Sequence, residues 1–385
     1  MAERSQVFPA AEFRDRLDRL QHQMMLRDLE LLLLTTPADI FYLTGFLTRF
    51  WESPARPWYL LVPVAAPPVA IIPSIGANLM ASTWIDDIRT WEAPNPADDG
   101  LSLLVDAIAE YRSSGAGLGI PMGPETYLRM PQADLHRLSQ SIDAPLIDGT
   151  DALRRTREVK SEAEISKIRE ICSIAGDAFA RLPEQIQVGQ PLEEIFRVFQ
   201  TLLLQSGADW VSYLAGAVGQ DGYGDVISPA TKAPLRAGDV LMLDTGAVKD
   251  GYFCDFDRNI FVGERSEAVR RTDEALWTAT EDVLEKIRPG HRACDIHQML
   301  IDALEHQGVR PCPGRLGHGL GITLTEWPSF APFDTTELRE GMVLTIEPSA
   351  FVKGDRFLVH EENFVLRADG AELLSPRAPR SGLEL

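Results

Sequence analysis

Acidic residues interrupt two neighbouring apolar runs that otherwise have the composition of buried β-strands. In the stretch LMLDTGAVKDGYFCDFDRNIF, Asp244 lies in the first run, and Asp255 and Asp257 lie in the second. The Asp-Gly pair between the runs predicts a β-hairpin with strands over 240–248 and 252–263. Side chains alternate along a strand, so Asp255 and Asp257 share one face. Buried carboxylates on adjacent strands repel each other, and a cation has to compensate their charge.

The same irregularity recurs nearer the end of the chain. Glu347 lies inside the apolar stretch MVLTIEPSAFV, and Glu361 and Glu362 lie inside FLVHEENFVL. His318 lies between the hairpin and these glutamates, in GRLGHGLGITLTEWP, where glycines on both sides allow close approach of the backbone. Any one of the acids alone would fit a strand edge that faces solvent. Four of them in strand centres, together with the histidine, favour a shared site.

A metal centre accounts for this group of residues. Four negative charges balance two divalent cations, and oxygen-rich ligands with one imidazole suit manganese, iron, cobalt or zinc. Two such ions held about 3.5–4 Å apart can activate a water molecule and polarise a carbonyl group. The expected ligands are Asp244, Asp255, His318, Glu347 and Glu361.

The chain divides into two expected domains. Residues 1–155 alternate between helix-like and strand-like segments, which indicates an α/β domain. Residues 156–385 begin with a helix whose first turn carries the capping-box pair Ser161 and Glu164, and they continue with hairpin strands and further helices. The second domain holds every expected metal ligand.

Composition narrows the choice of partners. Lys and Arg number 37 against 57 Asp and Glu, so the net charge is −20, which argues against binding to nucleic acid or to an anionic membrane. The most apolar run, residues 58–73, contains four prolines and is too short to span a bilayer. Four cysteines without C-x-x-C spacing fit a reducing cytoplasm. We therefore expect a cytoplasmic protein that binds neither nucleic acid nor membrane.

The motifs resemble those of the pita-bread metalloenzymes, which include methionine aminopeptidase, aminopeptidase P, prolidase and the non-peptidase creatinase. DTGAVKDGYFCDFDRN is similar to the family stretch D-x-G…GY-x-x-D-x-T-R, GHGLG to G-H-G-x-G, and EGMVLTIEPS to E-P-G-M-V-x-T-x-E-P. In HEENFVLRADG, the count back from Gly370 selects Glu361 rather than Glu362 as the ligand. PADIFYLTGF and REVKSEAEISKIRE are similar to the creatinase/prolidase-type N-terminal domain and its junction.

The resemblance extends over nearly the whole chain and implies an architecture. It implies an α/β creatinase/prolidase-like domain over 1–155, followed by an α+β pita-bread catalytic domain over 156–385 that holds two divalent metal ions. It also implies a homodimer, in which the N-terminal domain of one chain helps to close the site of its partner.

Several positions depart from the peptidases of the family. Two histidines that contact substrate in aminopeptidase P and prolidase correspond to Ile227 and Thr325 here. Gly314 replaces a histidine four residues before the metal histidine, and Val359 replaces an arginine two residues before the last glutamate. Asp257 replaces the threonine of D-x-T-R. The resemblance therefore implies an intact set of metal ligands beside altered substrate contacts.

Three functions are compatible with these motifs. The first is an amide-bond hydrolase of the Xaa-Pro peptidase type, in which Glu347 takes the proton of a metal-activated water and His318 belongs to the catalytic centre. The alternative is a non-peptidase member that acts on a small zwitterion, such as creatinase, ectoine hydrolase or the iron-dependent dimethylsulfoniopropionate lyase. GHGLGITLTEWP is similar to the H-G-x-G…E-W-P of that lyase. The third is a non-catalytic binding module, against which the retention of five metal ligands speaks.

Candidate contacts to a small peptide or zwitterion each have a structural alternative. Asp257 could bind metal or orient a ligand, or it could form a salt bridge with Arg258 or another arginine. Glu326 could act as a base or could hold the fold together. Tyr223 could line the pocket or lie in a loop without a role, and Trp51 could contact substrate across the dimer or take part in aromatic packing. The candidates are Asp257, Thr325, Glu326, Trp327, Tyr223 and Trp51.

Overall fold

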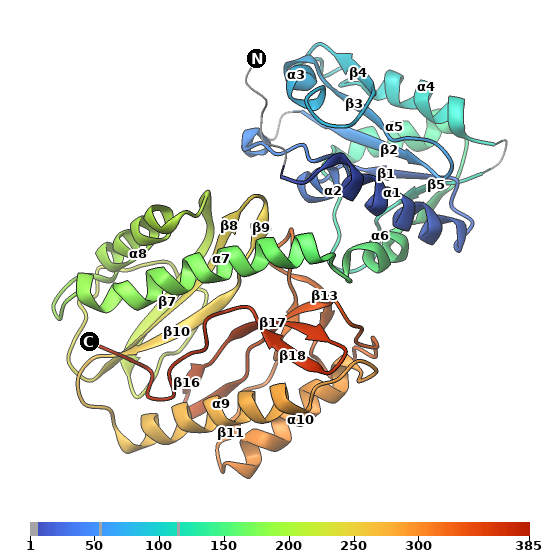
Figure 1. Ribbon diagram of the computed structural model, residues 1–385. Helices are drawn as coiled ribbons and strands as arrows, with labels where there is room; N and C mark the ends of the chain where they lie inside the picture. Colours follow the sequence, from blue (N-terminus) through green and yellow to red (C-terminus); the bar gives the residue numbers. More distant parts are fainter. Residues whose placement is uncertain (1–6, 54–55, 114–115) are drawn as a thin grey trace. The chain divides into compact units, whose positions relative to one another are not determined.

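The computed structural model describes residues 7–53, 56–113 and 116–385, and the chain forms two compact units (Figure 1). The first unit ends at Arg157 and the second begins at Glu158. The sequence pattern puts the domain boundary after residue 155. Helix α6 (Thr150–Arg157) continues two residues further, and the first unit ends where this helix ends.

A mixed six-stranded sheet with the order β4-β3-β2-β1-β5-β6 forms the centre of the first unit. The residues of its strands β1, β2 and β3 are all buried, which requires cover on both faces of the sheet. Helices alternate with the strands along the chain and provide this cover, so the expected α/β architecture is confirmed. The strands are β1 (Leu31–Leu34), β2 (Tyr59–Pro63), β3 (Val69–Pro73), β4 (Asp87–Trp91), β5 (Leu118–Ile120) and β6 (Leu146–Asp148). The helices before α6 are α1 (Ala10–Met25), α2 (Pro37–Thr44), α3 (Ala77–Met80), α4 (Leu101–Tyr111) and α5 (Gln132–Ile142).

Helix α5 begins later than its apolar periodicity indicates. The pattern predicts a helix over 127–139, whereas α5 spans Gln132–Ile142. Pro131 directly precedes it, and a proline inside a helix would remove a backbone donor and clash with the preceding turn. The helix therefore starts after the proline.

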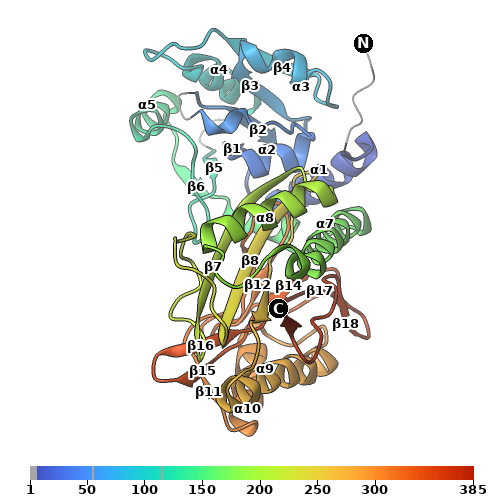
Figure 2. The same ribbon diagram turned by 90° about the vertical axis from the view of Figure 1, so that its left-hand side faces the viewer.

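The second unit contains three sheets and four long helices. The sheets have the orders β19-β10-β8-β7, with β9 paired to β8, then β13-β12-β14-β17-β18, and β11-β15-β16. Helices α7 and α8 pack on the first of these sheets, and α9 and α10 pack beside the strands β15 and β11 (Figures 1 and 2). The helices are α7 (Glu162–Arg181), α8 (Leu192–Ser206), α9 (Glu267–Lys286) and α10 (Ala293–His306). The strands are β7 (Trp210–Gln220), β8 (Asp239–Lys249), β9 (Tyr252–Phe253), β10 (Phe256–Phe261), β11 (Arg310–Pro311), β12 (His318–Gly319), β13 (Glu326–Ser329), β14 (Val343–Ile346), β15 (Ser349–Lys353), β16 (Arg356–Val359), β17 (Glu362–Arg367), β18 (Gly370–Leu373) and β19 (Leu383–Glu384).

The predicted hairpin is confirmed, and its turn explains the Asp-Gly pair. Asp250 and Gly251 both have positive φ, 51° and 84°, which is the backbone conformation that a two-residue hairpin turn requires. Strand β8 then pairs antiparallel with β9 and β10. The register puts Asp244 directly opposite Asp257, so these two side chains share one face of the sheet.

The first helix of the second unit begins where its capping signal predicts. The Ser161 side chain accepts from the backbone N–H of Glu164, and the Glu164 carboxylate accepts from the N–H of Ser161 in return. The second oxygen of Glu164 accepts from the hydroxyl of Tyr252, 3.1 Å away, which ties the helix start to the hairpin. None of the helices in the described ranges has the length and apolarity needed to cross a membrane.

Candidate metal centre

The expected ligands come from two different sheets of the second unit. Asp244 lies in β8 and Asp255 directly precedes β10, both in the first sheet. His318 begins β12, Glu347 follows β14 and Glu361 precedes β17, and these three strands are neighbours in the second sheet. Residues more than a hundred positions apart in sequence are thereby brought to one place.

Three of the five expected ligands form a tight, buried group. Potential ligand atoms of Asp255, His318 and Glu361 all lie within 4.8 Å of one another. The His318 Nε2 atom lies 3.3 Å from Asp255 Oδ2 and 3.9 Å from Glu347 Oε1. Glu347 thus borders the group, and Asp244 adds its charge to that of Asp255 and Glu347. These spacings leave room for a cation between the side chains.

The hydrogen bonds of His318 direct one ring nitrogen at the carboxylates. Its Nδ1 atom lies 2.8 Å from the carbonyl oxygen of Gly319 and must donate, because a carbonyl only accepts. In the neutral ring Nε2 then carries a lone pair, which faces Asp255 and Glu347. A lone pair aimed at carboxylate oxygens is stabilised by a cation between them.

A glycine beside His318 is required for this arrangement. A Cβ atom on Gly319 would lie 2.0 Å from the backbone oxygen of Trp327, far inside van der Waals contact. Strand β12 can therefore approach β13 this closely only without a side chain at residue 319.

Two buried oxygen atoms of the group lack a hydrogen-bond partner among the described residues. They are Oδ1 of Asp244 and Oε1 of Glu361. Buried carboxylate oxygens without partners are costly unless an ion takes that place. The donor set of four carboxylates and one imidazole, with these two oxygens unsatisfied, fits divalent metal ions.

The acids of the centre have raised pKa values, and burial is the main cause. Burial raises the pKa of Asp255 to about 8, against the opposing charge of Arg315. The pKa values of Asp244 and Glu361 are also raised by burial, and then by the charges of neighbouring carboxylates. Burial raises the pKa of Glu347, while His318 and Arg315 oppose the shift. Burial in the metal-free protein thus disfavours the ionised form of each of these four carboxyl groups.

Three residues that the sequence analysis did not single out shape the centre. The side-chain amide of Asn363 bonds both backbone groups of Asp255, and the hydroxyl of Tyr213 opposes the rise in the pKa of Asp244. Nε of Arg315 lies 3.4 Å from Glu347 Oε1. A polar Asn in the apolar run of β17 was a visible signal, but nothing in the sequence points to Tyr213.

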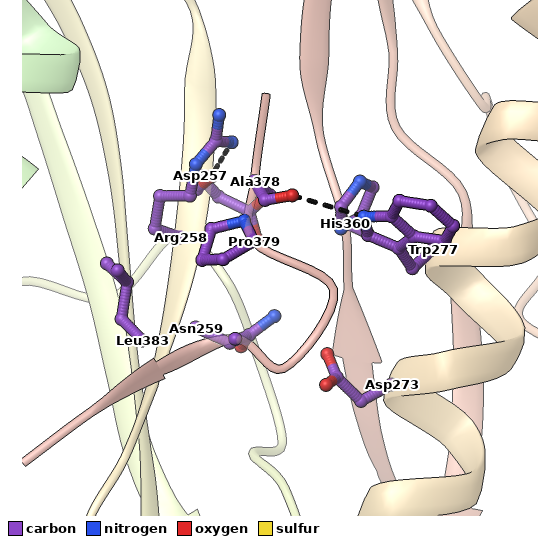
Figure 3. A pocket seen from close by; sticks show the side chains of 10 residues that line it. Asp257, Arg258, Asn259, Asp273, Trp277, His360, Ala378, Pro379 and Leu383 are labelled. Carbon is purple, nitrogen blue, oxygen red and sulfur yellow. Dashed lines mark hydrogen bonds between the residues drawn. The ribbon is translucent and has the colours of Figure 1, made fainter. Parts of the chain in front are cut away.

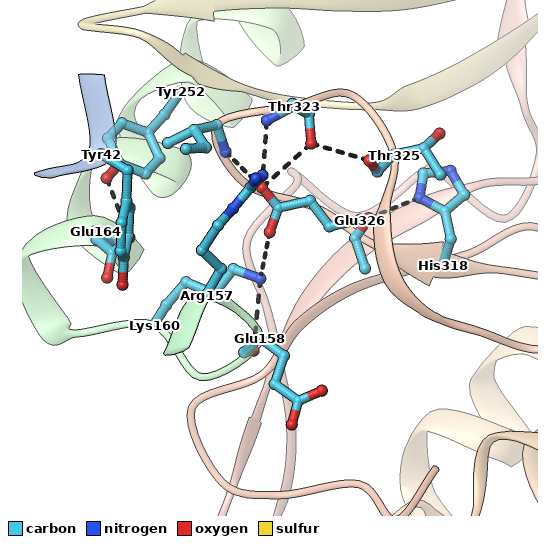
Figure 4. A network of polar contacts seen from close by, with 12 residues as sticks. Tyr42, Arg157, Glu158, Lys160, Glu164, Tyr252, His318, Thr323, Thr325 and Glu326 are labelled. Atoms are coloured by element: carbon cyan, nitrogen blue, oxygen red, sulfur yellow. Dashed lines mark hydrogen bonds and ion pairs between the residues drawn. The ribbon is translucent and has the colours of Figure 1, made fainter. Parts of the chain in front are cut away.

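Glu326 lies beside the centre but is fully engaged in structural contacts (Figure 4). One oxygen accepts from Lys160 Nζ at 3.1 Å, in an ion pair whose side chains are 1% and 2% exposed. The other accepts from the backbone N–H of Ile322 at 3.0 Å and from Thr323. These contacts support the interpretation that Glu326 stabilises the fold, and they give no support to a role as a catalytic base.

Two further candidates lie near Glu326 on the same segment. Thr325 is half-buried, and its carbonyl oxygen accepts from the Thr323 hydroxyl at 2.9 Å. Trp327 is also half-buried, in strand β13. Their predicted contacts with substrate stay predictions.

Tyr223 is completely buried and holds two strands together. Its hydroxyl accepts from the N–H of Val359 at 2.7 Å and donates to Asn259 at 3.0 Å. This position gives no support to the predicted substrate contact. In the first unit, Trp51 packs against Phe46 and Trp58, and the Arg129 guanidinium lies over its ring.

Asp257 lies next to the centre, and among the described residues its carboxylate forms no ion pair with an arginine. Arg258 instead pairs with Glu362, 2.9 Å away, and Oδ2 of Asp257 has no hydrogen-bond partner among the described residues. Asp257 also lines a cavity of about 20 Å³ with His360 and Asp273 (Figure 3). This volume accommodates about one water molecule and excludes a substrate. Whether Asp257 binds metal or orients a ligand stays a prediction.

Two family patterns match the chain in the order that the sequence predicts. Residues 16–159 match the creatinase/prolidase N-terminal domain, and residues 166–368 match metallopeptidase family M24. The second match includes all five expected ligands. The α/β domain before an α+β pita-bread domain is thereby confirmed.

Curated relatives carry dipeptidase names. An Xaa-Pro dipeptidase of Pyrococcus horikoshii is 28% identical over 228 residues, which are 58% of this chain and 64% of that protein. The match thus spans less than two thirds of this relative. A probable dipeptidase PepE of Mycobacterium tuberculosis is 26% identical over 345 residues, 88% of each chain.

Solved structures share the fold along almost the whole chain. The prolidase from Thermococcus sibiricus superposes with a TM-score of 0.86 and 25% identity, over 97% of this chain and 99% of that one. The dipeptidase PepE from Mycobacterium ulcerans gives a TM-score of 0.84 and 22% identity, over 98% and 99%.

Proposed function

The chain belongs to metallopeptidase family M24, and from this premise we propose that it is a metal-dependent hydrolase that cleaves the amide bond of a small Xaa-Pro peptide. Membership of the family implies divalent metal ions. One observation carries the proposal. The buried group of Asp255, His318 and Glu361 has potential ligand atoms within 4.8 Å of one another, and one oxygen each of Asp244 and Glu361 has no hydrogen-bond partner among the described residues. The names of the dipeptidase relatives support the choice of substrate.

The metal ligands in this proposal are the five residues expected from the sequence. When bound, two divalent ions would activate water and polarise the scissile carbonyl group. Asp244, Asp255 and Glu361 would hold the ions through carboxylate oxygens, and His318 would do so through Nε2. Nδ1–H of His318 keeps the ring oriented through Gly319.

Glu347 has the position and the chemistry of the proton acceptor. Its side chain is 22% exposed, so it lies where the buried group meets solvent. Its raised pKa favours uptake of the proton that the attacking water loses, and the same carboxyl group can pass that proton to the leaving amine.

The test measures hydrolysis of alanylproline by protein loaded with Mn²⁺, Co²⁺ or Fe²⁺, with a chelator as the control. Glu347→Gln should keep the fold and lower kcat by about 100-fold or more, because the proton acceptor is lost. Glu340→Gln is the matched control, since Glu340 is exposed and lies outside the centre. No hydrolysis of any Xaa-Pro peptide by metal-loaded protein would overturn the proposal.

Hydrolysis or lysis of a small zwitterion is the second candidate. It is favoured by Ile227 and Thr325, which stand where the peptidases that the sequence resembles carry histidines. Ile227 is 78% exposed, and its hydrocarbon side chain has no polar group to offer a substrate. Turnover of creatine, ectoine or dimethylsulfoniopropionate by protein that leaves Xaa-Pro peptides intact would decide for this function.

We also propose a homodimer and a cytoplasmic location. The family resemblance supports the dimer, and light scattering after size-exclusion chromatography would test it. Free cysteines at all four cysteine positions support a reducing compartment, which fractionation of cells would test.

A further inference from the structure

We propose that the cavity beside the candidate metal centre binds a single water molecule, which donates a hydrogen bond to Asp257. The same molecule bridges this carboxylate to His360 and Asp273, which line the cavity with it (Figure 3). The site lies outside the five expected metal ligands, and the inference does not rest on the proposed function. It gives Asp257 a partner other than a metal ion, an arginine or the substrate.

The cavity has the size of one water molecule. Its volume is about 20 Å³, which exceeds the roughly 10–15 Å³ that a water molecule needs and is far below the roughly 300 Å³ of small ligand pockets. Apolar cavities stay dry, but two carboxylates and an imidazole line this one. Size and polarity therefore both favour water.

Asp257 has an oxygen that requires a donor. The residue is 2% exposed, and its Oδ2 atom has no hydrogen-bond partner among the described residues. A buried carboxylate oxygen without a donor is costly, and such groups are satisfied by protein atoms or by ordered water. A water molecule in the cavity would supply the missing donor.

Other polar side chains of the cavity wall already have protein partners. Asn259 uses both ends of its amide in hydrogen bonds to protein atoms. Both terminal nitrogens of Arg258 donate to protein oxygens. Nε1 of Trp277 donates to the oxygen of Ala378 at 3.1 Å (Figure 3). These donors are engaged with other acceptors, which leaves Asp257 to a donor inside the cavity.

His360 and Asp273 supply the further partners that a buried water molecule needs. His360 is 7% exposed, and an imidazole carries at least one N–H donor in either protonation state. Asp273 accepts from Arg265 at 3.3 Å, and a carboxylate can accept several further hydrogen bonds. With Asp257 they make three partners, the usual number for a buried water molecule.

A third metal ion is the competing occupant, and the spacing of the side chains argues against it. Ligand atoms about 2.0–2.2 Å from one transition-metal ion lie at most about 4.4 Å apart. Among the described residues, the acid and histidine side chains around this cavity do not bring three potential ligand atoms within 4.8 Å of one another. Partners about 2.8 Å from one water molecule can lie up to about 5.6 Å apart, so water fits the wider spacing.

The segment that closes the cavity is itself held by hydrogen bonds. The N–H of Ala378 donates to Glu362 Oε1 at 2.8 Å, and Leu383 in β19 pairs with Ile260 in β10. Both Ala378 and Leu383 line the cavity. A water molecule there is enclosed by an ordered wall, as a structural water is.

A high-resolution crystal structure tests the site directly. We expect one peak of density in the cavity, about 2.6–3.2 Å from Asp257 Oδ2 and from a ring nitrogen of His360. Crystals grown with Mn²⁺ or Tl⁺ separate water from ions, because both ions scatter anomalously and water does not. An anomalous peak in the cavity for either ion, or a cavity without any density, would overturn the proposal.

The metal content of Asp257→Asn provides a test in solution. The amide has the shape of the carboxylate and still accepts a hydrogen bond from water, so the fold should be kept. We expect this variant to bind as much Mn²⁺ per chain as the wild type. Asp244→Asn, directly opposite on β8, should bind clearly less. A clear loss in Asp257→Asn would show that Asp257 is a metal ligand and would overturn the proposal.

Two variants of nearly equal shape test whether Asp257 needs a donor in the cavity. Ala378→Val and Ala378→Thr both displace the water, but only threonine brings a hydroxyl that can donate in its place. The unfolding equilibrium constant from urea denaturation should therefore be about tenfold higher or more for the valine variant than for the threonine variant. Equal constants, or a more stable valine variant, would overturn the proposal, because filling a dry cavity with an apolar group stabilises a protein.

Discussion

The side-chain amide of Asn363 holds both backbone groups of Asp255. Its Oδ1 accepts from the N–H of Asp255 at 2.9 Å, and its Nδ2 donates to the carbonyl oxygen of the same residue. Asn363 belongs to β17 in one sheet, and Asp255 precedes β10 in another. One buried amide therefore joins the two sheets that carry the expected metal ligands.

Replacement of this amide should weaken metal binding. Asn363→Leu should lower the affinity for Mn²⁺ by about 10–100-fold, because Asp255 loses the partner that orients it. The free energy of unfolding should fall by about 2 kcal/mol or more, since a buried N–H and a buried C=O are left unpaired. Calorimetric titration and urea denaturation measure the two effects. Asn95→Leu, at an exposed position of the first unit, is the control, and equal affinities in both variants would contradict the prediction.

Removal of Lys160 should destabilise the second unit strongly. Lys160→Met removes the cation 3.1 Å from the buried Glu326 carboxylate, and breaking such a buried pair should cost about 3–5 kcal/mol. Arg270→Ala breaks the exposed pair with Glu267 and should change stability by less than about 1 kcal/mol. Urea denaturation of both variants measures the difference. An equally small loss of unfolding free energy in both variants would show that the buried Lys160–Glu326 pair does not stabilise the second unit.

Metal affinity should rise with pH and metal binding should release protons. Burial raises the pKa of Asp255 to about 8 in the metal-free protein, so the group is largely protonated at pH 7 and must ionise to bind a cation. Affinity should increase from pH 6 to about pH 8 and then level off. Calorimetry in buffers of different ionisation enthalpy counts the protons. A flat affinity with no proton release would contradict this account.

The raised pKa of Asp255 also makes the stability of the metal-free protein depend on pH. Stability should fall as the pH rises, whereas metal affinity should increase. The folded state holds the proton of Asp255 more tightly than the unfolded chain, whose aspartates have pKa values of about 4. The contribution of this group to stability is therefore present below about pH 4 and is lost as the pH rises toward 8. Thermal unfolding in the presence of a chelator should show a fall of Tm across this window, and addition of metal should reverse it. A Tm that rises with pH in the presence of the chelator would contradict the claim that burial raises the pKa of Asp255.

A methyl group at residue 319 should disrupt the histidine segment. Gly319→Ala puts a Cβ atom 2.0 Å from the Trp327 oxygen, and we expect a loss of about 2 kcal/mol or more, together with reduced metal uptake. Gly263→Ala is the matched control, because its φ is +74° but no atom lies within 4 Å of the added methyl. The control should cost only about 1 kcal/mol and leave metal uptake unchanged. Equal losses in both variants would mean that the close approach of β12 and β13 has no special cost.

Local patterns in the sequence were sufficient to predict the hairpin and the start of α7. The Asp-Gly turn and the capping box of Ser161 and Glu164 act within a few residues, so their signals are visible in the chain itself. Four acids in apolar runs were equally visible, but only Asp244 lies inside a strand, whereas Asp255, Glu347 and Glu361 lie at strand ends rather than in the expected strand centres. The structure brings Asp255, Glu361 and His318 together, but their role as metal ligands stays a prediction.

Contacts between distant segments could not be predicted in this way. One partner of Glu326 is Lys160, 166 residues away, and only the fold distinguishes a glutamate in this ion pair from a catalytic acid. Asn363 and Asp255 are likewise 108 residues apart. The start of helix α5, in contrast, could have been predicted from a local signal. Pro131 is present in the sequence, and the helix begins directly after it although the apolar periodicity begins earlier.

Metal content per chain tests the central claim most directly. Elemental analysis of protein purified without added metal or chelator should find about two transition-metal ions per chain. His318→Ala, checked for folding by circular dichroism, should hold clearly less, because the only imidazole of the described ligand group is lost. Folded wild-type protein that contains no metal, and takes up none when Mn²⁺, Fe²⁺, Co²⁺ or Zn²⁺ is supplied, would contradict the account.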